Sequence, residues 1–531
     1  MTDWNGVVQV GLYFSPAILL LGAALVVFLL DVLGVKRRLT LGLVTLVGSV
    51  GALLLVLADL GWEPLLAIRT IPASMIDVPV APSDLWAFSS LGLIFQAIFL
   101  TAALLVLLAS LSRPAEEKGA AIFFGLLTLA TLGMLLAASA ANLFFLLLAL
   151  EVTAISSYLL VGYTRRDPRH LEAAMKFYII GALSTALSFF GASLLFGAFG
   201  SLSFVVLSQA TAPVTYPSLA WLGYAFLIAG VGFKVTAVPF HAWAVDVYDG
   251  APHDVSAFLA GGTKKVGLLA FFLIFIGPLT ILKFHPVECL PTCVIPYNFA
   301  PGLALTLGIL AVLTMTVGNV LALMQKEMKR MLAYSSISQA GYMLIGVAIG
   351  TSAAVTGATF QVFAHVFMKT GAFLVVGAVA ALGVGPLIQD WKGVGVRRPY
   401  LGLAFALMLL SLAGIPLTVG FVSKFVLFSA AVQAQGLYVW LAVAGVLNSA
   451  LSVYYYARVL KVMYIDRPEP MLETGLTPAT GSVSAALARI GYGRAAAIGV
   501  ATAAIVVFGV DPQLVLGPLQ SAAAHFVATG A

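Results

Sequence analysis

Long apolar stretches alternate with short polar segments along almost the whole chain. The apolar windows lie near residues 13-33, 39-60, 85-111, 119-138, 142-163, 172-198, 217-240, 252-277, 300-323, 330-350, 353-383, 400-430, 434-463 and 494-517. At about 1.5 Å of rise per residue, a helix of roughly 20 apolar residues crosses the hydrocarbon core of a bilayer. The pattern therefore predicts an all-α polytopic membrane protein with about fourteen transmembrane helices.

Two of the predicted helices contain residues that interrupt helical hydrogen bonding. Pro239 lies within 217-240, and Gly414 and Pro416 lie within 400-430. Proline removes a backbone donor, and the carbonyls that it frees inside a membrane need protein or water as partners. Because broken helices in two halves of a chain are typical of transport sites, we expect two broken helices beside a transport route. The pair of breaks suggests an internal repeat, although the sequence shows no clear self-similarity.

Four ionisable side chains lie near the middle of predicted spans: Glu151, Lys234, Lys264 and Lys424. Glu151 is roughly 15 Å from either end of its apolar run, which is the depth of the bilayer midplane. A lone charge there costs about 2.5 to 3.5 kcal/mol on insertion scales, and such groups normally face a wet interior and serve ion or proton movement. We predict that these four residues relay protons.

The pairing of acid and amine supplies a mechanism for such a relay. Burial favours the neutral form of a lysine, and a nearby carboxylate favours the charged form. At roughly 6 Å and an effective dielectric near 20, Glu151 and Lys234 would attract each other by roughly 3 kcal/mol. That energy is comparable with the about 2.3 kcal/mol needed to move one charge against about 100 mV. The alternative is a static ion pair that locks two helices.

Further basic residues in the spans have both a functional and a structural interpretation. Lys264 and Lys265 are about 100° apart on a helix, so at most one can face a pore squarely. We expect Lys265 to snorkel or to meet a neighbouring subunit. His365 and Lys369 are spaced i, i+4 and share one helix face, which fits either a relay or a packing contact.

Some polar residues near the ends of spans are explained better by a structural role than by proton transfer. Lys176 is near the start of its span and fits an interfacial position better than a relay. Asp84 precedes an apolar run and fits a helix start. The stretch 466-493 contains Pro, Gly and Ser, and we expect a surface loop there.

The segment HAWAVDVYDGAPHDV, between 217-240 and 252-277, contains no Lys or Arg. It places five titratable residues on the predicted cytoplasmic side: His241, Asp246, Asp249, His253 and Asp254. Titratable groups at a channel mouth could collect protons. The Asp249-Gly250 pair and Pro252 also make an ordinary turn and helix start.

Composition excludes several classes of protein. The chain of 531 residues is 61% hydrophobic and 9% charged, whereas soluble domains have about 25% charged residues. The formal charge of +6 is scattered through short loops, which favours lipid headgroups over nucleic acid. Cys289 and Cys293 cannot hold an iron-sulfur cluster and lack the spacing of a zinc site, so we expect a local disulfide or free thiols. Without a phosphate-binding motif, we expect no cofactor in this chain.

Charge in the loops predicts the orientation. The loops after spans 1, 3, 5, 9, 11 and 13 contain Lys36, Arg37, Arg38, Arg113, Lys118, Arg165, Arg166, Arg169, Lys326, Lys329, Arg330, Lys392, Arg397, Arg398, Arg467 and Arg489. The loops after spans 2, 4, 6, 8, 10 and 12 contain Arg69 and Lys283. By the positive-inside rule, the first set is cytoplasmic and both termini are non-cytoplasmic. No Lys or Arg precedes the first apolar run, so we expect a retained helix and no cleaved signal.

Several segments resemble one family closely. They are LALEVTAISSYLLVGY, GFKVTAVPFHAWAVDVYDGAPHDVSAFLAGGTKK, KEMKRMLAYSSISQAGYMLIG and LAGIPLTVGFVSKF. These segments resemble the antiporter-like membrane subunits of respiratory complex I, over about residues 85 to 465. The YSSIS run and LEVTAISSYLLVGY favour subunit N of NADH-quinone oxidoreductase, the counterpart of mitochondrial NADH dehydrogenase subunit 2.

The resemblance implies a fold, an activity and partners. It implies antiporter-like inverted repeats, with helices 1-3 in residues 1-111, a first repeat in 112-277, a second in 278-465, and a loop and last helix in 466-531. It implies a non-redox, proton-translocating subunit of a quinone oxidoreductase, bound to other membrane subunits in the cell (plasma or inner) membrane of a bacterium or archaeon. On matching positions, Glu151 and Lys234 become the coupling pair, Lys264 the central relay and Lys424 the terminal relay.

The sequence departs from that family at some positions. Gln339 stands where several relatives have histidine, and His365 and Lys369 look more like the other antiporter-like subunits than like many versions of subunit N. Two other functions are compatible with the same residues. One is a subunit of a cation/proton antiporter or membrane-bound hydrogenase, and the other is a structural scaffold whose buried charges only pair helices.

Overall fold

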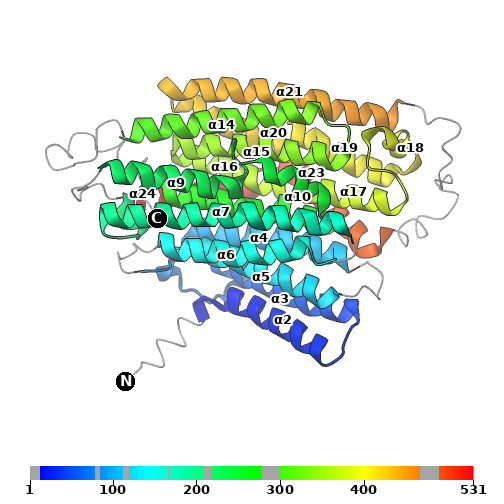
Figure 1. Ribbon diagram of the computed structural model, residues 1–531, viewed down its shortest axis with the longest axis horizontal. Helices are drawn as coiled ribbons and strands as arrows, with labels where there is room; N and C mark the ends of the chain where they lie inside the picture. The colour runs from blue at the N-terminus through cyan, green and yellow to red at the C-terminus, as the bar shows by residue number, and fades with distance from the viewer. Residues whose placement is uncertain are drawn as a thin grey trace.

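Parallel and antiparallel helices form a single bundle (Figure 1). The computed structural model describes residues 12–77, 84–111, 119–164, 167–208, 217–277, 299–466 and 490–529. Within those ranges there is no β-strand, and only three isolated bridges join loop segments. The prediction of an all-α fold is therefore confirmed.

The first half of the described chain supplies the helices at the lower side of Figure 1. They are α2 (Ser15–Val32), α3 (Arg38–Asp59), η1 (Glu63–Ile68), η2 (Ala73–Met75), α4 (Ser90–Ser110), α5 (Ala120–Ala138), α6 (Leu143–Val161), α7 (Pro168–Phe199), α8 (Phe204–Ser208), α9 (Pro217–Val235), α10 (Ala242–Gly250), α11 (His253–Phe258), η3 (Leu259–Thr263), α12 (Lys264–Phe271) and η4 (Phe272–Ile276).

The second half continues toward the upper side and then returns to the middle. Its elements are α14 (Phe299–Leu323), α15 (Met328–Ile349), α16 (Ser352–His365), η5 (Val366–Thr370), α17 (Gly371–Ala381), η6 (Ile388–Trp391), α18 (Val394–Arg397), α19 (Pro399–Ala413), α20 (Val419–Gln433), η7 (Gly436–Tyr438), α21 (Val439–Tyr464), α23 (Tyr492–Val510) and α24 (Gln513–Thr529).

Length and composition identify the membrane-crossing segments. Thirteen helical stretches of the described chain are long and apolar enough to cross a membrane, or up to fourteen if a pair bent by 120°, 388–397 and 399–413, is counted as one span. Helix α20 is apolar but has only 15 residues, which is too short to cross alone. It directly follows α19, which also has 15 residues.

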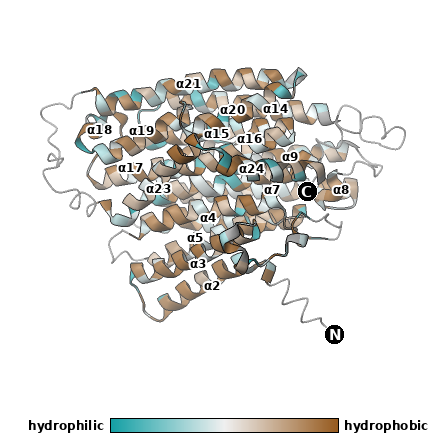
Figure 2. Cartoon of the chain, turned by 180° about the vertical axis from the view of Figure 1, so that it is seen from behind, coloured by the Kyte–Doolittle hydropathy of each residue, from teal (hydrophilic) through white to brown (hydrophobic). Residues whose placement is uncertain are grey.

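The helices differ strongly in how much of their surface is buried. In the apolar 18-residue stretches of α15 and of 352–381, 94% of the residues are buried inside the protein. In those of α2 and α7, 33% are buried. The outer helices expose Leu, Ile, Val and Phe side chains, and Figure 2 shows α2 and α3 as mainly hydrophobic along their lengths. Lipid tolerates such a surface and water does not. Helix α15 therefore lies at the centre, where several helices can reach its polar side chains.

Two spans are interrupted where the sequence predicts breaks. Helix α9 ends at Val235 and α10 begins at Ala242, while α19 ends at Ala413 and α20 begins at Val419. The chain turns there through left-handed backbone conformations at Thr236 (φ 66°), Gly414 (φ 89°) and Leu417 (φ 70°). The predicted end at 240 was too early, because the helix resumes as α10 after the break, whereas the predicted span 400-430 already included both α19 and α20.

The described residues also include three segments of π-helix, which lie in spans other than the two broken ones. They are η3, η4 and η5, and η3 and η5 lie in two different long spans, 253–276 and 352–381. A π-turn inserts an extra residue and shifts the side chains that follow it, and it is frequent at functional sites. A Cβ on Gly261 of η3 would lie 1.9 Å from Oγ1 of Thr370 in η5, so the two π-turns are in close contact.

Two boundaries differ from the sequence prediction. Helix α4 begins at Ser90, because the Ser89 side chain accepts the Gly92 backbone N–H, so Asp84 is not the helix start. The last span was expected to reach residue 517, but α23 ends at Val510 before Pro512, and α24 then packs against α16 and α4. Cys289, Cys293 and most of the stretch 466-493 lie outside the described residues.

The close approach of α12 to the end of α9 yields a stability prediction. A Cβ on Gly267 would lie 2.9 Å from the Lys234 carbonyl carbon and from the Val235 backbone nitrogen. Because backbone atoms cannot move aside, we expect Gly267→Ala to destabilise the protein by about 1–3 kcal/mol. A lower thermal unfolding temperature in detergent would report this loss. Gly22→Ala is the control, since nothing lies within 4 Å of its Cβ position, and equal unfolding temperatures for the two variants would contradict the prediction.

Candidate functional site

The ion pair between α6 and α9 is mostly buried, and α7 covers one side of it. Lys234 Nζ donates to Glu151 Oε1 at 3.3 Å, and the two side chains are 9% and 22% exposed. Thr185 on α7 donates its hydroxyl to the same Glu151 oxygen at 2.6 Å. Lys234 occupies the last turn of α9, where the negative end of the helix dipole favours a cation. Three helices therefore meet at one carboxylate oxygen.

A small cavity adjoins this pair. It has a volume of about 30 Å³ and is lined by both Lys234 and Lys264, together with the hydroxyl-bearing residues Thr153, Ser157 and Thr263. A water molecule needs about 10–15 Å³ of such space and polar partners. The cavity has room for about two waters between the two lysines.

Lys264 and Lys265 follow the π-turn η3 and are both buried. Lys264 Nζ donates to the Ser336 carbonyl on α15 at 2.7 Å, and Lys265 Nζ donates to the Ala260 carbonyl at 3.1 Å. Their exposed fractions are 4% and 2%. The prediction that Lys265 would snorkel or meet a neighbouring subunit was wrong, because the π-turn exposes the carbonyl of Ala260 to it inside the bundle.

Lys369 and His365 lie in the same buried region. Lys369 Nζ donates to the Leu332 carbonyl at 2.9 Å and to the Ser335 hydroxyl, both on α15. His365 is fully buried, and neither ring nitrogen has a hydrogen-bond partner within the described residues. Lys264, Lys265 and Lys369 interact electrostatically with His365. The two π-turns thus gather four basic groups around α15.

A series of amide and hydroxyl groups connects this region to Lys424. Gln361 Nε2 donates to Gln339 Oε1 at 2.7 Å, and the Ser423 hydroxyl donates to Gln361 Oε1. Gln339 Nε2 donates to the Leu412 carbonyl at 3.2 Å, and Lys424 Nζ donates to the same carbonyl at 2.8 Å. Gln339 is one helical turn beyond Ser335 on α15, so the series continues from the Lys369 contact.

Lys424 is held by the broken end of α19. Its Nζ also donates to the Ala413 carbonyl at 3.1 Å and to the Ser449 hydroxyl at 3.0 Å, and it lies 5.0 Å from the centre of the Tyr342 ring. The break at Gly414 frees these last carbonyls, which carry the negative end of the helix dipole. An open cavity of about 720 Å³ between α20 and α21 is lined by Lys424 and Ser449.

Sequence reasoning missed several polar residues of this series. Ser335, Ser336, Gln361 and Ser423 are buried yet uncharged, so they do not stand out against apolar spans. Gln361 had a detectable signal, because it precedes His365 and Lys369 at i, i+4 and i+8 on one face. The alternation of hydroxyl residues in YSSISQ gave no comparable indication of which side chain faces which helix.

The structure places His241, Asp246, Asp249, His253 and Asp254 in the first break and the helices that follow it, and not in a long loop. His241 lies in the break itself and is half-buried, and Asp246 and Asp249 lie on α10. The described chain has no loop there because the span resumes. His253 begins α11, and Asp254 is fully buried. Asp246 and Asp249 therefore lie on a helix and have basic partners, and the collection of protons by this segment stays a prediction.

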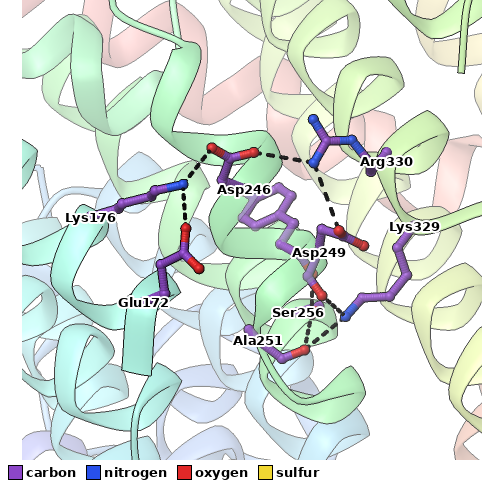
Figure 3. Close-up of polar contacts among 9 residues, drawn as sticks. Glu172, Lys176, Asp246, Asp249, Ala251, Ser256, Lys329 and Arg330 are labelled. Atoms are coloured by element: carbon purple, nitrogen blue, oxygen red, sulfur yellow. Dashed lines mark hydrogen bonds and ion pairs between the residues drawn. The ribbon is translucent and has the colours of Figure 1, made fainter. Parts of the chain in front are cut away.

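A network of ion pairs surrounds α10 (Figure 3). Asp246 accepts from Lys176 of α7 at 3.2 Å and from Arg330 of α15 at 3.1 Å, and Asp249 lies 3.7 Å from Arg330. Lys176 also pairs with Glu172 at 2.8 Å. The network fastens the second half of the broken helix to its two neighbours. Lys176 thus lies near a span end, where the sequence placed it, and holds α10 there.

Lys329 secures the turn that follows α10. Its Nζ donates to the carbonyls of Asp249 and Ala251 at 2.6 and 2.7 Å (Figure 3). Ser256 donates to the Tyr248 carbonyl at 2.8 Å. These bonds satisfy carbonyls at the helix end. The turn between α10 and α11 is consequently tied to α15.

Asp254 belongs to a second buried network. Its side chain is 0% exposed and accepts from Arg494 of α23 at 3.2 Å and from the Ser110 hydroxyl of α4 at 3.3 Å. Arg38 of α3 donates to the Ser110 carbonyl at 2.9 Å. This network joins α3, α4, α11 and α23.

Among the described residues, no group of three or more His, Cys, Asp or Glu side chains could hold a metal ion.

Comparison with known proteins gives consistent matches. Residues 140–452 match the family described as NADH:quinone oxidoreductase/Mrp antiporter, TM. The chain is 36% identical to F(420)H(2) dehydrogenase subunit N of Methanosarcina mazei over 512 residues, which are 94% of this chain and 96% of that protein. It is 39% identical to NADH-quinone oxidoreductase subunit N of Trichlorobacter lovleyi over 391 residues, covering 73% and 76% of the two chains.

Solved structures show the same arrangement. A chain of respiratory complex I from Thermus thermophilus has a TM-score of 0.72 and 29% identity, covering 94% of this chain and 98% of its own. A chain of the Mrp complex from Dietzia sp. has a TM-score of 0.77 and 21% identity and covers 100% of both chains. The second match, at low identity, bears on the fold alone.

The buried Asp254–Arg494 pair gives a prediction about stability. Removing one partner of a buried ion pair leaves the other charge poorly compensated and costs about 3–5 kcal/mol. We therefore expect Arg494→Met to lower the unfolding temperature clearly, and Arg494→Met combined with Asp254→Asn to recover part of the loss. Thermal unfolding of the purified variants measures both effects. A double variant less stable than Arg494→Met would contradict this account of the pair.

Proposed function

The chain belongs to the NADH:quinone oxidoreductase/Mrp antiporter family of membrane proteins, and we propose from this premise that it is the non-redox, proton-translocating subunit of a complex I-like quinone oxidoreductase. The relatives named above are subunit N of an F(420)H(2) dehydrogenase and of NADH-quinone oxidoreductases. The observation that supports the proposal best is the series of buried polar groups from Glu151 to Lys424 in an otherwise apolar bundle.

The first step of the relay is the opening of the ion pair. When Lys234 is close to Glu151, the carboxylate favours the charged amine, and when the two separate, burial favours proton release. The cavity between Lys234 and Lys264 has room for about two waters. A proton released by Lys234 would therefore pass to Lys264 across water.

The remaining steps run along α15. Lys264 contacts the Ser336 carbonyl and Lys369 contacts the Ser335 hydroxyl, so adjacent residues of one helix hold the two amines. His365, which has no hydrogen-bond partner within the described residues, is available to exchange protons with its basic neighbours. We propose Glu151, Lys234, Lys264 and Lys424 as the relay, and His365 and Lys369 as further members.

His241 has a weaker position in this scheme. It is half-buried in the break between α9 and α10, where it interacts electrostatically with Lys264. We propose it as a candidate for proton delivery to the break. Asp246 and Asp249 are held in ion pairs with Lys176 and Arg330, which suits a structural part better than proton collection.

The proposal includes partners and location. Electron transfer would take place in other subunits, and no flavin, iron-sulfur cluster or nucleotide is proposed for this one. Further membrane subunits, including antiporter-like ones, would flank the bundle in the cell membrane of a bacterium or archaeon. The basic loops would face the cytoplasm and both termini the opposite side. We also propose that residues 112-277 and 278-465 form two inverted repeats, each containing one broken helix.

Two other functions remain distinguishable by experiment. A cation/proton antiporter subunit would show sodium-dependent transport, and a scaffold would use its buried charges only to join helices. The cavity beside Lys234 favours a relay over a scaffold, because a static pair has no need of adjacent space for water.

Replacing Lys234 tests the relay. In the assembled complex in proteoliposomes, we expect Lys234→Ala to abolish turnover-linked proton pumping while the complex still assembles. The control is Lys461→Ala, which removes an exposed lysine on α21 whose side chain is 65% exposed. Unchanged pumping in Lys234→Ala would support the scaffold. Pumping that requires sodium would support the antiporter.

Replacing Gln361 tests the connection to Lys424. Gln361→Leu removes the donor to Gln339 and the acceptor of Ser423 and leaves both without that partner. At about 1–3 kcal/mol for a buried unsatisfied group, we expect pumping to fall roughly tenfold. Gln361→Glu retains the acceptor and is the comparison variant. Wild-type pumping rates in Gln361→Leu would place the route elsewhere.

A further inference from the structure

Thr185 makes a contact that the relay scheme does not yet use. It lies on α7, and its hydroxyl donates to Glu151 Oε1 at 2.6 Å, the same oxygen that accepts from Lys234 at 3.3 Å. Within the described residues, these are the two side chains that donate to Glu151. The carboxylate oxygen is therefore shared between a neutral donor and a charged donor.

The position of Thr185 is fixed relative to Lys234. The neighbouring Ser184 donates its hydroxyl to the Gly230 carbonyl of α9 at 2.6 Å. A Cβ on Gly230 would lie 2.1 Å from Ser188 Oγ, and a Cβ on Gly191 would lie 2.8 Å from the Gly223 carbonyl oxygen. Helices α7 and α9 thus approach each other closely on both sides of Thr185, so its hydroxyl is a pre-placed donor.

We infer that Thr185 is a positioning residue that allows the Glu151–Lys234 pair to open. When Lys234 moves away, a carboxylate that is only 22% exposed and has no donor would be unfavourable inside a membrane-spanning bundle. The Thr185 hydroxyl keeps one hydrogen bond to Oε1 during that movement, which lowers the cost of separation. Sharing one oxygen also weakens the hold of Lys234 in the closed state.

This inference rests on the proposed function, because opening of the pair matters only if the pair takes part in the relay. Thr185 does not itself accept or pass on the proton in this account. Tyr158 also interacts electrostatically with Glu151, and a Cβ on Gly181 would lie 2.0 Å from the Tyr158 hydroxyl oxygen. Tyr158 therefore packs against α7.

The alternative is that Thr185 only fills space between α6 and α7. Valine has nearly the same shape as threonine but no hydroxyl, and serine keeps the hydroxyl but loses the methyl group. If only packing matters, Thr185→Val should behave as wild type and Thr185→Ser should be the poorer variant. If the hydroxyl matters, the order is reversed.

The test uses the assembled complex in proteoliposomes. We expect Thr185→Val to lower the maximal rate of quinone reduction and the coupled pumping by about tenfold, with unchanged KM for quinone and electron donor, and Thr185→Ser to restore most of the rate. Ser193→Ala is the control on the same helix, since within the described residues the Ser193 hydroxyl bonds the Phe190 carbonyl of its own helix and no other group. Wild-type rates in Thr185→Val would overturn the inference.

An infrared measurement separates positioning from packing. The carboxylate stretching band that disappears in Glu151→Gln reports the hydrogen bonding of Glu151. This band should shift in Thr185→Val and keep its wild-type position in Thr185→Ser. An unshifted band in Thr185→Val would overturn the inference, and Thr185→Ala replaces the valine variant if that variant does not assemble.

Comparison of Lys234→Ala with Thr185→Val separates a wrong relay from a wrong role for Thr185. If Lys234→Ala stops pumping while Thr185→Val pumps normally, the relay stands and the part given to Thr185 is wrong. If Lys234→Ala pumps normally, the relay itself is wrong.

Discussion

Charged groups inside a bilayer must be paired, hydrogen-bonded or hydrated, and this requirement accounts for most irregular features of the protein. Glu151 is paired with Lys234 and bonded by Thr185. Lys424 takes the carbonyls that the end of α19 leaves free, and Lys265 takes a carbonyl within a π-turn. The helix breaks and π-turns supply the polar partners that a regular apolar helix cannot offer.

Helix α15 carries the consequences of that requirement through the bundle. Of the residues in its apolar 18-residue stretch, 94% are buried, and its polar residues contact three other spans. Ser336 meets Lys264, Ser335 meets Lys369, and Gln339 meets Gln361 and the end of α19. At its start, Lys329 and Arg330 hold α10, the second half of the broken helix that carries Lys234 (Figure 3). Helix α15 therefore contacts the central lysines, the terminal lysine and α10, which continues the broken helix after the half that carries Lys234.

The sequence allowed the prediction of the fold class and of the helix breaks, since hydropathy and proline are read directly from the chain. It also drew attention to Glu151, Lys234, Lys264 and Lys424, because a charge within an apolar span stands out. It could not place Lys265, because the single-helix argument did not include the π-turn before it. It could not find Thr185, because neutral polar residues are common in spans and only three-dimensional packing shows which ones face a charge. Gln361 shares a helix face with His365 and Lys369, but its contact with Gln339 also required the packing of two helices.

The account depends on water between acid and amine groups at the centre of the bundle. A map of the assembled complex at a resolution that shows ordered water tests this most directly. We expect water in the cavity between Lys234 and Lys264, and at least one state in which Lys234 has left Glu151. A dry cavity with the pair closed in every state would contradict the relay.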